Sequence, residues 1–218
     1  MKWQILIVSQ RSRHEFLSQL LCQLERQIAA LGLNRFDQVD VSIHVDETGK
    51  WMGQAAEIGD MRERMRQQST GEYINFVDDD DLISGDYVSS ILPLLDGVDQ
   101  VGFEVECFCD HNKLGVASHS IIHKGWSQTN GRYGMDPMKF CRDISHLNPM
   151  RRDLALAVPM SGGIGEDCRW ANDMRTRGIV KTENFIPRSL YWYFWRGKKN
   201  DVNDPHDPWR QQWLDKLI

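Results

Sequence analysis

Four consecutive aspartates, Asp78–Asp81, directly follow the apolar segment Glu72–Val77, and this junction constrains the fold more than any other feature. The segment is β-prone and Gly71 interrupts what precedes it, so a short buried strand is predicted. Four adjacent like charges repel one another, and they need either full solvation or a nearby cation. Carboxylates at a strand end are ligands that Mg²⁺ or Mn²⁺ prefers, usually shared with phosphates of a substrate. An acidic surface turn is the simpler alternative.

The composition is that of an ordinary globular protein. The 218 residues suffice for one large domain or two small ones, and 41% are hydrophobic and 26% charged. A net charge of −5 gives no global basic surface for polyanions. The apolar run near residue 1 is too short for a signal peptide, and no later segment is long enough to span a bilayer, so neither a leader nor stable membrane insertion is expected.

The cysteines indicate a reducing compartment. They are odd in number and widely spread, without the second Cys/His set that a zinc site needs. Reduced thiols and a cytoplasmic location are therefore expected. The five residues are Cys22, Cys107, Cys109, Cys141 and Cys168.

The first half of the chain predicts alternating strands and helices. Residues 4–9 form an apolar strand, leucines then recur at helical spacing until Gly32, and residues 39–45 alternate as a second strand. Strand, helix and strand at this length form a βαβ unit with a parallel sheet and a right-handed crossover. A second helix is predicted over Ala55–Gln68, ahead of the acidic strand.

The alternation stops near the middle of the chain. A helix over Tyr87–Leu95 is predicted, with Pro93 distorting its end. Residues 98–108 and 114–122 predict an antiparallel hairpin, and residues 125–142 an irregular loop. The fold class is therefore α/β, with a nucleotide-binding half and a mixed half that shapes a substrate site.

The last third of the chain carries three further features. Gly165-Glu166-Asp167 precedes an amphipathic helix, and Ile179–Val180 predicts a late strand. Trp209, Trp213 and Leu217 predict a helix that docks on the rest of the fold.

Three segments in order carry a family resemblance: the βαβ opening, Gly71–Asp81 and Gly165–Ala171. Together they resemble the family 2 glycosyltransferases with the glycosyltransferase-A fold, over most of the chain as far as Tyr193. The resemblance implies one glycosyltransferase-A-like domain over residues 1–218 with a mixed central sheet. Residues 1–97 would then form the nucleotide-sugar-binding half, and residues 98–218 a smaller acceptor-binding half with a C-terminal tail.

In that family the strand ends in a DxD motif, which holds a divalent metal on the diphosphate of the sugar nucleotide. Asp78 and Asp80 match the two motif positions, and Asp81 is adjacent. The resemblance implies a Mn²⁺ or Mg²⁺ site at Asp80 and Asp81, and contacts from Asp78 and Asp79 to the nucleotide sugar.

Three more donor-side residues follow from the resemblance. Ser9 matches the strand end near the nucleoside, and Asp46 matches the carboxylate that meets the base. Arg62 matches a nucleotide-contacting arginine, although Glu63 replaces the asparagine that the family has next. Each has a simpler alternative: Asp46 is a common turn residue, and Arg62 could pair with Glu63 or Asp60 at the surface.

On the acceptor side, Glu166 and Asp167 resemble an acidic pair of the family, which makes Asp167 the catalytic base. The alternative is that both residues cap the following helix. A late histidine often completes the metal shell in the family, but Trp192 stands where it is expected, so His206 or water would be the third ligand. His146 is interpreted as a structural histidine.

The resemblance implies an inverting, metal-dependent glycosyltransferase that uses a nucleotide-sugar donor. The acceptor is a glycan or lipid-linked saccharide, or else a hydroxymethylated base in DNA, as in virus-encoded transferases that work in the host cytoplasm. The clusters Arg62-Arg64-Arg66 and Arg151-Arg152 favour DNA, and the acidic total argues against it. Two rivals are a nucleotidyltransferase, although residues 10–14 lack its glycine-rich loop, and a non-catalytic nucleotide-sugar-binding module.

Overall fold

A computed structural model describes the chain in eight segments. These cover residues 1–32, 38–46, 57–109, 111–125, 127–129, 138–163, 165–195 and 205–217. Two residues at the start of the predicted second helix, Ala55 and Ala56, lie outside them.

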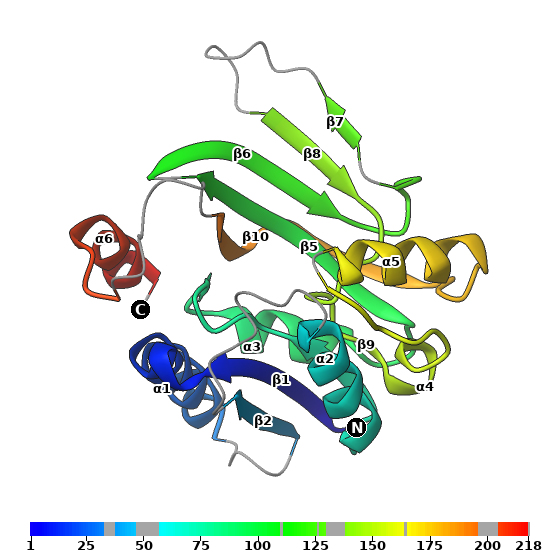
Figure 1. Ribbon diagram of the computed structural model, residues 1–218, viewed down its shortest axis with the longest axis horizontal. Helices are drawn as coiled ribbons and strands as arrows, with labels where there is room; N and C mark the ends of the chain where they lie inside the picture. Colours follow the sequence, from blue (N-terminus) through cyan, green and yellow to red (C-terminus); the bar gives the residue numbers. More distant parts are fainter. Residues whose placement is uncertain are drawn as a thin grey trace.

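The first half is the predicted βαβ arrangement, followed by the acidic strand. Strand β1 pairs in parallel with both β2 and β3, which confirms the parallel sheet (Figure 1). Because parallel strands end at the same edge, the carboxyl ends of all three strands lie together. The elements are β1 (Trp3–Gln10), the 3-10 helix η1 (Arg11–Arg13), α1 (His14–Ala30), β2 (Val39–Asp46), α2 (Glu57–Gln68) and β3 (Tyr73–Phe76).

The middle of the chain also follows the prediction. Strands β5 and β6 form the antiparallel hairpin, and the helix before them ends in a 3-10 turn that contains Pro93, the residue expected to distort it. The elements are β4 (Leu82–Ile83), α3 (Tyr87–Ile91), η2 (Leu92–Leu94), β5 (Gln100–Cys109) and β6 (Asn112–His119).

Two predictions for the later part are wrong. The stretch 125–142 contains two short strands, and β8 pairs in parallel with β6. No strand forms at Ile179 and Val180, which instead pack against a core cluster beside α5. The remaining elements are β7 (Ser127–Thr129), β8 (Met138–Arg142), β9 (Met150–Arg151), α4 (Arg152–Ala155), α5 (Glu166–Thr176), β10 (Glu183–Trp195) and α6 (Pro208–Leu217).

The strands form one mixed sheet, in the order β2-β1-β3-β9-β5-β6-β8-β7, and β10 pairs with β5 and β4. Side chains of β1 alternate between two cores. Ile5 and Ile7 pack with α1 and α3, whereas Leu6 and Val8 pack with α2, α4 and α5. Helices therefore cover both faces of the parallel part of the sheet, and the division at residues 97 and 98 stays a prediction.

Helix α6 docks as predicted. Leu214 joins Phe108 and Trp192 in a third core cluster, against which Trp209 and Trp213 pack. Within the described residues, no helix combines the length and the apolar character that crossing a bilayer requires.

Candidate active site

The four aspartates occupy a turn at the carboxyl end of β3, where the other two parallel strands also end. Each carboxylate faces a different part of the protein. Like-charge repulsion is thus compensated residue by residue rather than by solvation, so the alternative of an acidic surface turn is wrong.

Asp78 points into the central cavity of the protein. Its carboxylate lies 2.5 Å from the Arg62 guanidinium and is 24% exposed. Burial opposes ionisation, but Arg62 and a hydrogen bond with His146 together lower the pKa of Asp78 below its ordinary value. The Asp78 backbone N–H donates to the hydroxyl of Tyr191 at 3.0 Å, which fixes the position of the residue.

Asp79 is buried and turned toward the end of β1. The hydroxyl of Ser9 donates to it at 2.6 Å, and the Arg13 guanidinium lies 2.9 Å away. Burial and the neighbouring charge of Asp80 raise the pKa of Asp79 to about 7. The two predicted donor-site residues Ser9 and Asp79 are therefore in direct contact.

Asp80 forms an ion pair with Arg13, and its side chain is 17% exposed. Its backbone carbonyl accepts a hydrogen bond from Arg210 of α6 at 2.6 Å. The same guanidinium donates to the carbonyl of Asp81 at 3.3 Å and stacks over Phe16 and Phe194. Helix α6 thus fastens the backbone of the acidic turn.

Asp81 points into the protein. Its carboxylate accepts hydrogen bonds from the hydroxyl of Tyr191 at 2.7 Å and from the backbone N–H of Phe194 at 2.9 Å. Burial and the charge of Asp80 hold the pKa of Asp81 well above its ordinary value. Its predicted role as a metal ligand stays a prediction, and it requires the carboxylate to leave these two partners.

The donor set suits an ion that is shared with a substrate. Among the described residues, no group of three or more His, Cys, Asp or Glu side chains could hold a metal by itself. Mg²⁺ on a diphosphate needs only one or two carboxylates, because phosphate oxygens and water supply the other ligands. The partly exposed carboxylate of Asp80 could supply one such ligand, and the roles of Asp80 and Asp81 as metal ligands stay predictions. His206 instead lies 3.2 Å from Glu15, with its side chain 71% exposed.

Asp46 ends β2 and is buried, in register with Gln10 at the end of β1. Strand β1 separates β2 from β3 in the sheet. The predicted base-contacting residue therefore lies along the same strand edge as Ser9, and its role stays a prediction.

Arg62 is buried rather than at the surface. It is 4% exposed and pairs with both Asp78 and Glu166, not with Glu63 or Asp60. The interpretation of Arg62 as a surface ion pair is wrong. Arg62 joins α2, the acidic turn and the start of α5.

Glu166 and Asp167 begin α5 but do not cap it. The N-cap position is Gly165, whose φ of 81° suits glycine, and no side-chain hydrogen bond caps the helix. The alternative of a helix cap is therefore wrong. Asp167 pairs with Arg142 of β8 and lines the same cavity as Asp78.

His146 stands between the two carboxylates of the cavity. Its Nε2 lies 3.5 Å from Asp78 and its Nδ1 lies 3.5 Å from Asp167. Burial favours the neutral acid, but His146 and Arg142 together hold the pKa of Asp167 well below its ordinary value. Asp167 is therefore ionised at neutral pH, and one imidazole ring separates the predicted base from the acidic turn.

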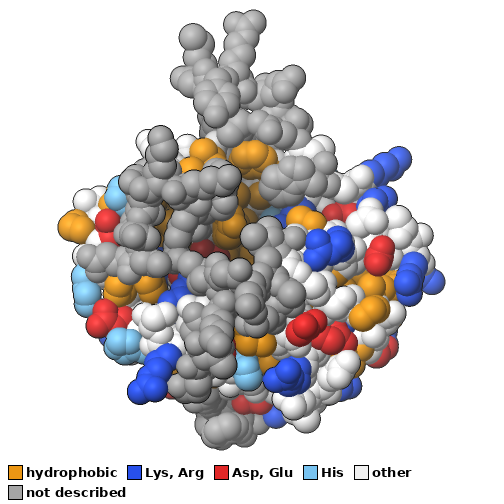
Figure 2. Space-filling model, in the orientation of Figure 1, with side chains coloured by type: hydrophobic (Ala, Val, Ile, Leu, Met, Phe, Trp, Pro, Cys, Tyr) orange, Lys and Arg blue, Asp and Glu red, His pale blue; other side chains and the backbone are white. Residues whose placement is uncertain are grey.

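The cavity has a volume of about 750 Å³. Its lining combines the charged side chains described above with apolar residues of β5, β6 and β8. On the face shown in Figure 2, hydrophobic side chains gather near the middle, with charged side chains beside them. A volume of this size accommodates a sugar and part of an acceptor.

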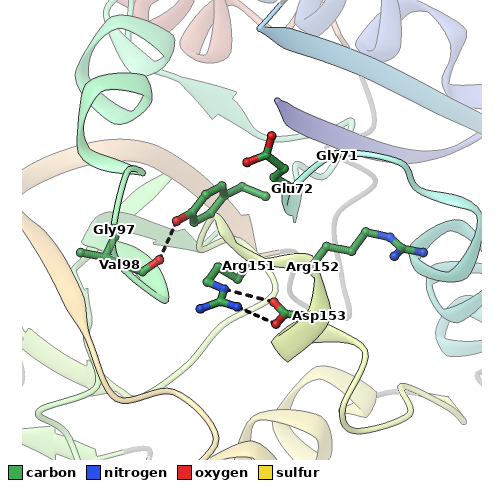
Figure 3. Close-up of a pocket in the computed structure, with 8 residues that line it drawn as sticks. Gly71, Glu72, Gly97, Val98, Arg151, Arg152 and Asp153 are labelled. Atoms are coloured by element: carbon green, nitrogen blue, oxygen red, sulfur yellow. Dashed lines mark hydrogen bonds and ion pairs between the residues drawn. The ribbon is translucent and has the colours of Figure 1, made fainter. Parts of the chain in front are cut away.

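The two arginine clusters do not form a basic face. Arg62 and Arg66 are buried, which leaves Arg64 as the exposed member of the first cluster. Arg151 and Arg152 line a second cavity, of about 540 Å³, beside Tyr73 at the opposite end of β3 from the aspartates. Figure 3 shows Arg151 joined to Asp153.

Sequence reasoning missed five residues that shape this site. His146 lies in a mixed polar and apolar run, and Arg13 ends the short 3-10 helix that follows β1, but neither pattern states which side chain the residue contacts. The five residues are Arg13, Arg142, His146, Tyr191 and Arg210.

No protein-family model matches the sequence, and no curated protein matches it significantly. Solved structures share the fold. S. aureus TarS 1-349 in complex with UDP-GlcNAc superposes with a TM-score of 0.58 at 15% identity, over 91% of this chain and 60% of that one. The same fragment with UDP gives 0.51 at 14% identity, over 89% and 61%.

Glucosyl-3-phosphoglycerate synthase from Mycobacterium tuberculosis, in complex with Mn²⁺, UDP and glucosyl-3-phosphoglycerate, gives a TM-score of 0.48 at 13% identity, over 99% of this chain and 80% of that one. The chain spans about 60% of the length of the TarS fragment. At these identities the comparisons show the fold, which is glycosyltransferase-A-like as the sequence predicted.

Proposed function

We propose that this protein is a glycosyltransferase that moves a sugar from a nucleotide-sugar donor to an acceptor hydroxyl, with inversion at the anomeric carbon. One observation carries the proposal. Asp78 of the acidic turn, at the carboxyl ends of the parallel strands, and Asp167 line one cavity, with His146 between their carboxylates. In open α/β sheets, ligands bind at this edge.

The donor would lie along the ends of β1, β2 and β3. Ser9, Asp46 and Arg62 would contact the nucleotide, together with Asp78 and Asp79. A TarS structure of the same fold contains UDP-GlcNAc, so uridine nucleotides are the first donors to test.

Asp80 would hold Mn²⁺ or Mg²⁺, with Asp81 as the adjacent carboxylate. A bound ion would supply positive charge that neutralises the diphosphate as the bond between sugar and phosphate breaks. The chain's part is to place the carboxylate of Asp80, which pairs with Arg13, while Arg210 hydrogen-bonds the backbone carbonyl of the same residue.

Asp167 would act as the general base. The acceptor O–H proton moves to its carboxylate as the oxygen attacks the anomeric carbon, and the nucleoside diphosphate leaves from the opposite side. Because Asp167 is already ionised at neutral pH, it is ready to accept that proton. A base in reach of the hydroxyl contributes about 10²–10⁴-fold.

The acceptor classes are not equally supported. A hydroxymethylated base in DNA loses the support of the arginine clusters, since Arg62 and Arg66 are buried. A nucleotidyltransferase would use a basic side chain in the turn after β1. That turn is η1, and its Arg13 already pairs with Asp79 and Asp80, so this alternative is less supported. A cytoplasmic location belongs to the proposal, and its support is the odd number and wide spread of the five cysteines.

A thermal-shift panel of nucleotide sugars, with and without Mn²⁺, tests the proposal. A ligand that binds only the folded state raises Tm. At 100 times its Kd, it adds about 2.7 kcal/mol to the free energy of unfolding. We expect a Mn²⁺-dependent rise with at least one donor, and release of its nucleoside diphosphate. Asp80→Asn should lose that rise, whereas the control Asp96→Asn, at an exposed position, should keep it. The absence of any donor-dependent shift would refute the proposal.

A further inference from the structure

Arg13 is a cation that the chain itself places against the acidic turn. It ends η1, the short 3-10 helix that directly follows β1, at the carboxyl edge of the parallel strands. Its guanidinium lies 2.9 Å from the carboxylate of Asp79 and also pairs with that of Asp80. Arginine stays charged at every physiological pH, so one fixed positive charge bridges two neighbouring carboxylates.

The two bridged carboxylates differ in their access to solvent. The side chain of Asp79 is 1% exposed, and it also accepts a hydrogen bond from the hydroxyl of Ser9. The side chain of Asp80 is 17% exposed. Asp80 is therefore the member of the pair that an ion from solvent can reach, and it is the residue to which the proposed function gives Mn²⁺ or Mg²⁺.

The guanidinium of Arg13 opposes a divalent ion at Asp80. Like charges repel strongly at a partly buried site, where the effective dielectric constant is well below that of water. The pair with Arg13 already neutralises Asp80, so an ion that arrives alone gains little attraction and meets the charge of Arg13. Both carboxylates are thus poor ligands for a lone ion while Arg13 bridges them.

A diphosphate changes this balance in two ways. Its oxygens supply ligands that the protein does not, since Mg²⁺ sites on nucleotides use only one or two carboxylates. Its negative charge also offers the guanidinium of Arg13 another partner, because the paired N–H groups of arginine match phosphate oxygens. The position of Arg13 at the strand edge, where ligands of open α/β sheets bind, permits that exchange.

We propose that Arg13 makes the binding of the divalent ion depend on the donor. In the free protein, Arg13 occupies Asp80 and weakens the binding of a lone ion. When a nucleoside diphosphate is bound, Arg13 turns to the phosphate oxygens and leaves Asp80 to the ion. The proposal rests on the proposed function and adds the order in which its two ligands are held.

Mn²⁺ binding to the wild type, with and without UDP, gives the first test. Free Mn²⁺ has an electron paramagnetic resonance signal that is lost on binding, so a titration yields Kd without any sugar transfer. A protein-free titration corrects for Mn²⁺ held by UDP in solution. We expect UDP to lower the Kd of Mn²⁺ about 10-fold or more, and Mn²⁺ to tighten UDP by the same factor. An equal Kd with and without UDP would overturn the proposal.

The variant Arg13→Gln removes the charge and keeps a polar side chain. We expect it to bind lone Mn²⁺ about 10-fold more tightly than the wild type, and to gain less from UDP. Arg13→Lys keeps the cation and should bind lone Mn²⁺ as weakly as the wild type. Arg11→Gln is the matched control, because Arg11 is exposed on the same 3-10 helix, and it should leave the Kd of Mn²⁺ unchanged.

A second variant covers the case in which Arg13→Gln does not fold. The double variant Arg13→Gln/Asp79→Asn removes a buried charge together with its partner, which avoids leaving one of them uncompensated. It also keeps the net charge of the turn, so tighter binding of lone Mn²⁺ by this variant would isolate the contact between Arg13 and Asp80.

The failures are distinguishable. If neither UDP nor any nucleotide sugar raises the Tm of the wild type, the proposed function fails and takes this inference with it. If UDP and Mn²⁺ bind together but both Arg13 variants without the cation bind lone Mn²⁺ no more tightly than the wild type, the competition by Arg13 alone is wrong. Weaker binding of lone Mn²⁺ by these variants would show that Arg13 positions Asp80 for the ion, which also overturns the proposal.

Discussion

Replacing Arg62 with methionine should destabilise the protein much more than the same change at the exposed Arg64 of α2. Arg62 is 4% exposed, and its guanidinium pairs with Asp78 and Glu166. Methionine retains most of the apolar stem, which covers the ring of Phe76. The substitution therefore removes the cation and leaves two carboxylates without it.

The magnitude follows from burial. Glu166 is 4% exposed, so the loss of Arg62 leaves it as an uncompensated buried charge, at a cost of about 3–5 kcal/mol. Asp78 is more exposed and keeps His146 as a neighbour, so it adds less. For a chain of this size, that corresponds to a fall in Tm of about 6–20 °C.

The effect should depend on pH with a definite sign. Arg62 depresses the pKa of Asp78, and a depressed carboxylate pKa stabilises the fold above the ordinary value of about 3.9. That contribution disappears as pH falls through the lower folded pKa. The difference between wild type and Arg62→Met should therefore be full at pH 7 and shrink in acid.

Urea unfolding at pH 7 and at about pH 2.5 measures these differences. Arg64→Met is the matched control, because Arg64 lies on the same helix and is exposed, so a change within about 0.5 kcal/mol is expected. Adding Glu166→Gln to Arg62→Met should recover part of the loss. A destabilisation of Arg62→Met no larger than that of Arg64→Met would refute the buried ion-pair network.

Three further variants probe the same site. Arg142→Gln removes a cation that lowers the pKa of Asp167, so the acid limb of the pH–rate profile should move to higher pH; an unmoved limb would contradict the pairing. Arg210→Met removes two hydrogen bonds to the acidic turn and should cost about 1–3 kcal/mol in urea unfolding, against no change for exposed Arg177→Met. Because the pKa of Asp79 is about 7 when folded and about 3.9 when unfolded, its contribution to stability falls as pH rises between these values. When Tm is measured against pH, Asp79→Asn should lack that decline. A decline equal to that of the wild type would contradict the raised pKa of Asp79.

The parts of the fold that the sequence predicts are those with strong local periodicity. Helical spacing and strand alternation placed α1, β1, β2 and the hairpin of β5 with β6. The strands that were missed include the 13-residue β10 and two short ones, β7 and β8. β7 has three residues and β8 has five, too few for an alternation to stand out. β8 pairs with the edge of β6, and β7 pairs with β8.

Arg62 shows a signal that was present and not used. Ile58, Met61, Arg62 and Met65 have the spacing i, i+3, i+4 and i+7, which defines one buried face of a helix. An arginine on that face has to find carboxylates inside the protein. Periodicity alone therefore predicts its burial, although not its partners.

The partners themselves lie beyond sequence reasoning, because they come from distant segments. His146 reaches back 68 residues to Asp78, and Tyr191 reaches back 110 residues to Asp81. Four aspartates that are alike in the sequence therefore acquire four different surroundings. Burial alternates along β6 and places His119 on an inward face. That alternation does not state which residues surround the side chain.

The most direct test of the account compares Asp167→Asn with wild type in two assays on the same protein. One assay measures the Mn²⁺-dependent Tm shift with a nucleotide sugar, and the other measures sugar transfer to an acceptor. The account predicts an unchanged shift, because the donor lies at the acidic turn, and a loss of transfer of about 10²–10⁴-fold. Transfer at the wild-type rate by Asp167→Asn would contradict it.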